Sequence, residues 1–159
     1  MYEISILLNE KQCLIGNAYA MCSEKDSAPY HAIETLLKGP EVALPEGVTF
    51  KDKDGHTRKV TRIKWWIPAH YEIKERLHLG SELTSDHKLA DMPLDSGYLY
   101  PLAYKPAFIG HYWMNDKIPK SLSHNCACLD YSIAEGGKLV AYKWRGEKQL
   151  KESHFERCK

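Results

Sequence analysis

One histidine lies in a sequence context that suggests chemistry. Phe108-Ile-Gly-His111-Tyr-Trp is a short apolar run that ends in glycine and then His111. A side chain directly after the carboxyl end of a sheet strand points into a crevice, and a preceding glycine lets the backbone turn tightly. A neutral imidazole in that place binds a metal ion, and its aromatic neighbours exclude water. The residues alone leave a second interpretation open, in which a backbone carbonyl holds a partly buried His111.

The cysteines are a second set of potential ligands. The chain has five of them, an odd number, which predicts reduced thiols rather than a disulfide framework. Cys126 and Cys128 are two residues apart and therefore share one face of a strand. Their spacing differs from the CxxC of zinc knuckles, and no second cysteine pair lies at zinc-ribbon distance. We expect Cys126 and Cys128 to be buried side chains of the core.

Composition limits the class of protein. The chain has 159 residues, of which 43% are hydrophobic and 27% are charged, as in a globular domain. Lys and Arg number 22 and Asp and Glu 21, so a formal net charge of +1 gives no support for nucleic-acid binding. No apolar run approaches the ~20 residues that span a bilayer, and Glu3 precedes the first short run where a signal peptide would carry basic residues. We expect a cytoplasmic protein that binds neither membrane nor nucleic acid.

Periodic patterns predict the elements that would position these residues. A helix is expected over 30–38, capped by Asp26 or Ser27 and ended by Gly39. Two alternating runs at 48–51 and 58–66 flank the turn Asp52-Lys-Asp-Gly-His and predict a hairpin. The region 69–100 reads as a long loop with a short helix near 72–79. Further strands are expected at 107–110, 125–131 and 139–144, and a short helix or tail at 146–159.

Several segments in this order resemble a known family. They are Phe108-Ile-Gly-His-Tyr-Trp, then Ala127-Cys-Leu-Asp-Tyr-Ser, then Gly136-Gly-Lys-Leu-Val-Ala-Tyr-Lys-Trp, preceded by Phe50-Lys-Asp-Lys-Asp-Gly-His and Trp65-Trp66. Together they resemble the C-terminal part of calcineurin-like metallophosphoesterases, in the branch of the bacterial diadenosine tetraphosphatases and phosphoprotein phosphatases. The resemblance covers roughly residues 30–150.

The resemblance implies a fold and a site. Such enzymes hold two metals (manganese, iron or zinc) between the sheets of an α/β/β/α sandwich, where the metals activate water and clamp the phosphate. We therefore expect an α/β (α+β) fold with a mixed, largely antiparallel sheet and a few flanking helices. His111 matches the family's ligand of the second metal. Trp113 stands where many relatives carry another histidine, so no second ligand is transferred.

The family's other ligand motifs have no counterparts. The only Asp-x-His is Asp54-Gly-His56, inside the hairpin turn, where it matches a different part of the family; Gly-Asp and Gly-Asn-His are absent. The expected organisation is therefore a poorly matched segment 1–29, the C-terminal half of a metallophosphoesterase-like domain at 30–150, and a charged tail at 151–159. No residue is assigned a catalytic role.

Two functions follow as alternatives. The first is a truncated metallophosphoesterase-like protein that lacks most metal ligands and is inactive alone; the second is a non-catalytic α/β interaction or binding module. Without the other half, apolar faces bearing Trp65, Phe108 or Val140 become exposed, which favours an N-terminal half chain as partner or self-association. An aromatic nucleic-acid surface from Trp65 to Tyr98 and Tyr104 is disfavoured, because acidic residues interleave with the basic ones.

Overall fold

The computed structural model describes residues 4–95 and 99–158. Its mixture of helices and mainly antiparallel strands confirms the predicted α+β class. The helices are η1 (Ile4–Leu7), α1 (Ala18–Ser23), α2 (Ala28–Lys38), α3 (Ile73–Arg76), η2 (His87–Leu89), η4 (Ile133–Glu135) and η5 (Glu152–His154). The strands are β1 (Glu41–Ala43), β2 (Phe50–Lys51), β3 (Thr57–Arg58), β4 (Val60–Ile63), β5 (Leu77–His78), β6 (Ala107–Ile109), β7 (Cys126–Cys128), β8 (Asp130–Tyr131), β9 (Lys138–Tyr142) and β10 (Phe155–Cys158).

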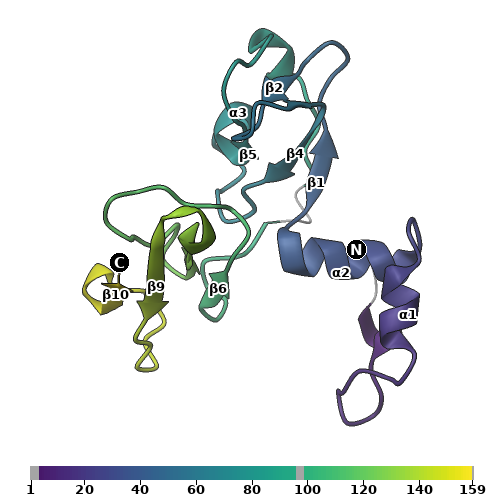
Figure 1. Cartoon of the computed structure of the whole chain (residues 1–159), viewed down its shortest axis with the longest axis vertical. Helices are drawn as coiled ribbons and strands as arrows, with labels where there is room; N and C mark the ends of the chain where they lie inside the picture. Colours follow the sequence, from purple (N-terminus) through teal and green to yellow (C-terminus); the bar gives the residue numbers. More distant parts are fainter. Residues whose placement is uncertain (1–3, 96–98, 159) are drawn as a thin grey trace.

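The N-terminal helices form an arm that stands out from the strands (Figure 1). The predicted helix is confirmed as α2: the Ser27 hydroxyl accepts a hydrogen bond from the Tyr30 N–H at 3.2 Å, which caps its first turn. Gly39 ends the helix with φ +88°, and its N–H donates to the Thr35 carbonyl. Leu36 and Leu37, near the end of this helix, are 62% and 66% exposed.

The middle of the chain forms one sheet and one hairpin. Strands β1, β4 and β5 pair antiparallel in the order β1-β4-β5, while β2 and β3 form the predicted hairpin. The single second strand expected over 58–66 was wrong: it breaks at Lys59 and ends at Ile63. The Lys59 carbonyl accepts a hydrogen bond from the Leu44 N–H at 2.8 Å, so the chain changes partner from β2 to β1 at this residue.

The C-terminal region contains a parallel pair and a second antiparallel sheet. Strands β6 and β7 pair in parallel, and β8, β9 and β10 form a sheet in which β9 is central. The short helix or tail expected at the end of the chain instead finishes as strand β10, in which Phe155 pairs with Tyr142. The two rings lie 5.0 Å apart edge to face, and this contact anchors the terminal strand.

Two hydrophobic cores lie on different parts of the fold. The first gathers Leu44, Val48, Phe50, Ile63, Leu77, Leu89 and Met92 around β4 and β5. The second gathers Trp66, Tyr112, Cys126 and Cys128. The Tyr112 hydroxyl donates to the Ile63 carbonyl at 2.9 Å, so this buried ring links the second core to the strand that bounds the first.

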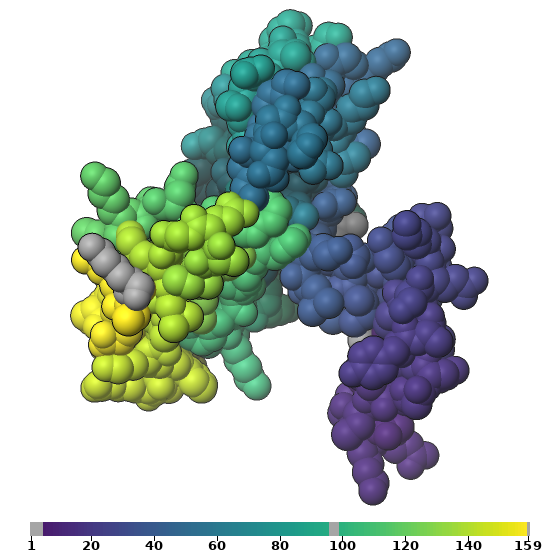
Figure 2. Space-filling model, in the orientation of Figure 1, coloured from purple at the N-terminus to yellow at the C-terminus, as the bar shows by residue number. Residues whose placement is uncertain are grey.

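Of the three apolar residues expected to be exposed, one is clearly exposed and one is buried. Phe108 is 39% exposed as predicted and Trp65 is half-buried, but Val140 is buried because β9 has a strand on either side. The arm, the β1–β5 region and the β6–β10 region protrude from one another (Figure 2). Within the described parts of the chain, no helix combines the length and the apolar character that crossing a bilayer requires.

Candidate functional site around His111

His111 lies directly after the carboxyl end of β6, as the sequence predicted. It has φ +66°, a left-handed conformation that is uncommon for a residue other than glycine. Its backbone N–H donates to Asp130 Oδ2 at 3.0 Å, and Asp130 Oδ1 accepts from the Ser132 N–H at 3.1 Å. The Asp130 carboxylate, in the strand that follows β7, therefore holds the turn that presents the histidine.

The imidazole of His111 faces a guanidinium. Arg62 Nη2 lies 3.1 Å from His111 Nε2. Because a guanidinium only donates hydrogen bonds, Nε2 must accept, and the neutral ring carries its proton on Nδ1. Partial burial, then Arg62 and Lys38, lower the pKa of His111, which favours this neutral form. The arrangement gives His111 the protonation state of a metal ligand, but its Nε2 lone pair already has a partner.

Trp113 closes one side of this site. Its ring lies 5.2 Å from the imidazole of His111 in an edge-on arrangement. The Lys53 ammonium lies 5.0 Å from the centroid of the same ring and also pairs with Glu135. The turn of the β2–β3 hairpin is thereby held beside the His111 segment. A second cation also lies near Trp113, since the Arg62 guanidinium on β4 is 5.9 Å from the centroid of its ring.

The surroundings of His111 show whether this chain alone could hold a metal ion there. Within the described residues, His111 belongs to no group of three potential ligand side chains, and Arg62 adds a positive charge at the atom that would bind the ion. The described residues of this chain alone therefore do not fit the two-metal centre that the family resemblance implies. His111 as a ligand completed by residues of another chain stays a prediction.

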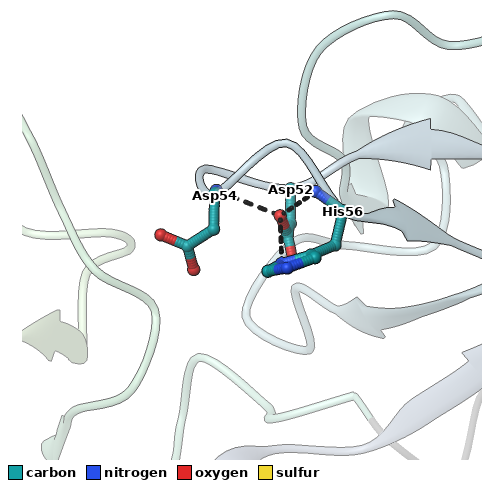
Figure 3. A group of neighbouring side chains, drawn as sticks. All are labelled: Asp52, Asp54 and His56. Atoms are coloured by element: carbon teal, nitrogen blue, oxygen red, sulfur yellow. Dashed lines mark hydrogen bonds and ion pairs between the residues drawn. The ribbon is translucent and has the colours of Figure 1, made fainter.

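One group of three ligand-type side chains does exist among the described residues, at the hairpin turn. Atoms of Asp52, Asp54 and His56 lie within 4.8 Å of one another (Figure 3). Asp52 Oδ1 accepts from the backbone N–H groups of Asp54 and His56 at 3.0 and 2.9 Å, and Oδ2 accepts from Arg58 at 2.7 Å. Desolvation acts to raise the pKa of Asp52, but these hydrogen bonds outweigh it and the pKa is lowered. The carboxylate thus serves to fold the turn.

The remaining predicted residues pack rather than gather at His111. Cys126 and Cys128 are fully buried, and burial raises the pKa of Cys126 to about 12, so both behave as core thiols. The aromatic residues form a continuous edge-to-face row with centroids 4.7–5.5 Å apart: Tyr104, Tyr100, Trp65, Trp66 and Tyr112. Tyr98, also predicted for this surface, lies outside the described residues.

Sequence reasoning missed Arg62 and Asp130 as neighbours of His111. The signal for Arg62 was present, since strand alternation places it on the face opposite the buried Ile63. Its pairing with a histidine 49 residues later depends on tertiary structure.

Comparison with known proteins adds nothing to this description: no family model, no curated protein and no solved structure matches the chain.

Proposed function

We propose that this chain is related to metal-dependent phosphoester hydrolases and corresponds to the C-terminal half of their fold. By itself it holds no complete two-metal centre and hydrolyses no phosphoester. His111 becomes a ligand of the second metal (manganese, iron or zinc) only where an N-terminal half contributes the remaining ligands. We place the protein in the cytoplasm, without a membrane or nucleic-acid partner.

The parallel pair β6–β7 is the observation that carries this proposal. Parallel strands occur almost only in sheets whose two faces are covered, and within the described chain β6 and β7 pair only with each other. Phe108, in the centre of β6, is 39% exposed. Such a pair is expected at the border of a larger sheet, and His111 follows the strand that lies at this border.

The total surface supports the same conclusion. The chain exposes 10,828 Å², whereas a compact monomer of 18.3 kDa is expected to expose about 8,100 Å². This excess of about 2,700 Å² belongs to one chain, and obligate interfaces bury about 1,000–2,500 Å² or more on each partner. Among the described residues, the large apolar side chains that are at least half exposed are Tyr19, Leu36, Leu37, Tyr104, Ile118, Ile133, Leu139 and Trp144. This surface favours association with an N-terminal half chain or with a second copy.

A second candidate function is a non-catalytic interaction module with the same surface. The hydrogen bond from Arg62 to His111 favours it, because this contact occupies the lone pair that a metal would need. In that case His111 and Arg62 hold the turn after β6 against β4, and they bind no ion.

An assay of the purified chain tests the proposal. We expect no turnover of p-nitrophenyl phosphate or diadenosine tetraphosphate with Mn²⁺, because the ligands of the first metal are missing. Metal-dependent turnover by the chain alone that disappears in His111→Ala would contradict it, since a complete site would then lie within these 159 residues. The reading frame upstream of this chain offers a second check: Asp-x-His and Gly-Asn-His encoded there support a split enzyme.

A further inference from the structure

Strand β1 has one edge without a partner. It is the outermost strand of the sheet β1-β4-β5 and lies at the border of the middle region (Figure 1). The Leu44 N–H donates to the Lys59 carbonyl on the side of β4. Backbone groups alternate in direction along a strand, so those of Glu41 and Ala43 face away from β4. Among the described residues, no other backbone or side chain forms a hydrogen bond with these outward groups.

An apolar groove lies beside this edge. It has a volume of about 450 Å³, and its apolar lining comes from Val42 and Leu44 in the β1 segment and from Met92 and Pro93. Val42 packs against the first core but remains partly exposed, so that core reaches the surface here. A strand added to β1 would place every second side chain on the side of this groove.

Two opposite charges also line the groove. Lys88 and Asp91 are both exposed, and neither has an ion-pair partner among the described residues; the Lys88 ammonium donates only to the Glu46 carbonyl. In a two-fold contact between identical surfaces, residue i meets residue j and residue j meets residue i. A rim that carries one charge of each sign is therefore complementary to the same rim of a second copy.

The outward backbone groups also fix how β1 pairs with its own copy. In an antiparallel pair, Glu41 and Ala43 of the second copy exchange both N–H···O bonds. Val42 then lies opposite Val42 of the second copy on the groove side, and no like charges meet. The free edge of β10 is less suitable, because the registers centred on that strand place Glu156 opposite Glu156 or Arg157 opposite Arg157.

We propose that β1 pairs with β1 of a second copy across a two-fold axis, which joins the two sheets into one and closes the groove of each chain. The chain exposes about 2,700 Å² more than a compact monomer, and an interface of standard size needs only about 800 Å² from each copy. Pro45 has no N–H, so the pairing ends there. The inference rests on the association with a second copy named in the proposed function, but not on the relationship to phosphoester hydrolases.

Two substitutions at one position test the strand edge, with the dimer measured by sedimentation equilibrium of the full chain. Ala43→Pro removes an N–H that faces the second copy and keeps the pairing with β4, because proline is tolerated on the open side of an edge strand. We expect a dissociation constant of the dimer at least about tenfold higher than in the wild type. Ala43→Ser keeps this N–H and is the matched control, so its constant should stay unchanged.

The rim charges give a second test. Lys88→Asp places acidic rims against each other, so we expect weaker association. Adding Asp91→Lys to Lys88→Asp exchanges the two charges and restores the opposite pairs, so the affinity of the wild type should return. Damage to the fold by Lys88→Asp would not be repaired in this way.

Hydrogen exchange of the wild-type chain, measured by NMR, decides the matter even where a variant does not fold. The amides of Glu41 and Ala43 should exchange more slowly as the protein concentration rises. The proposal is overturned where the wild type stays monomeric, where these amides exchange at a rate independent of concentration, or where Ala43→Pro associates as strongly as Ala43→Ser. Association that persists in Ala43→Pro overturns this interface alone, whereas metal-dependent turnover by the chain alone contradicts the proposed function and not this interface.

Discussion

Gly39 joins α2 to the body of the protein at a point where no other residue fits. Its φ of +88° and ψ of 161° fall in a region that is essentially restricted to glycine. A Cβ built on it would lie 2.1 Å from the Tyr112 hydroxyl oxygen and 2.9 Å from Cζ of the same ring. Tyr112 cannot move freely, because it is 2% exposed, donates to Ile63 and packs against Trp66 at 4.7 Å. We therefore predict a large loss of stability in Gly39→Ala.

The size of this loss follows from two contributions. The backbone conformation costs a residue with a side chain about 1–3 kcal/mol, and forcing a methyl group against a packed ring costs about 1–3 kcal/mol more. The expected total, about 2–6 kcal/mol, is a large part of the ~5–15 kcal/mol that stabilises a domain. Gly136→Ala is the matched control, since Gly136 has φ +83° but no atom within 4 Å of the added Cβ. It should lose only about 1–2 kcal/mol.

Urea unfolding followed by tryptophan fluorescence measures both variants. A double-mutant cycle with Tyr112→Phe isolates the contact, because phenylalanine lacks the hydroxyl that comes closest to the new methyl group. We expect Gly39→Ala to cost at least about 1 kcal/mol less in the Tyr112→Phe background than in the wild type. The reasoning is refuted where Gly39→Ala costs no more than Gly136→Ala, or where the two substitutions are additive.

Three further predictions concern other parts of the chain. The hydrogen bond from the Tyr142 hydroxyl lowers the pKa of Glu147 to about 2 from the usual 4.5, so the stability that the ionised Glu147 contributes is present above pH 4.5 and is lost as pH falls towards 2. Urea midpoints measured at both pH values should therefore fall less in Glu147→Gln than in the wild type, and an equal fall contradicts this. Ser27→Ala removes the cap of α2 and should cost about 1 kcal/mol in urea unfolding; an unchanged midpoint excludes the cap. Sedimentation should show association that rises with concentration and decreases in Leu37→Ser, whereas a monodisperse wild-type monomer would count against an unpartnered surface.

The elements that the sequence predicted well are those with local causes. Helix α2 has its cap at Ser27 and its stop at Gly39, each within a turn of the helix, and the Asp-Gly turn determines the β2–β3 hairpin by itself. The break at Lys59 could not be predicted, because it depends on a hydrogen bond to Leu44 in a different sheet. Strand β10 was missed for a similar reason: its charged sequence pairs with β9, and pairing between strands is a tertiary property.

The sequence predicted the position of His111 after a strand, but not the residues that contact it. The run from Phe108 to Gly110 correctly placed His111 after a strand. The contacts that define its chemistry come from Arg62 on β4 and Asp130 after β7, which lie 49 and 19 residues away in sequence. No local pattern encodes such distances.

Reconstitution tests the central claim most directly. An N-terminal half of a metallophosphoesterase, carrying Asp-x-His and Gly-Asn-His, is expressed with this chain as a separate polypeptide. The turnover of p-nitrophenyl phosphate is then measured with Mn²⁺. The account predicts turnover only when both halves are present, its loss in His111→Ala and no change in Lys148→Met. Two halves that associate without turnover, or turnover that persists in His111→Ala, would contradict it.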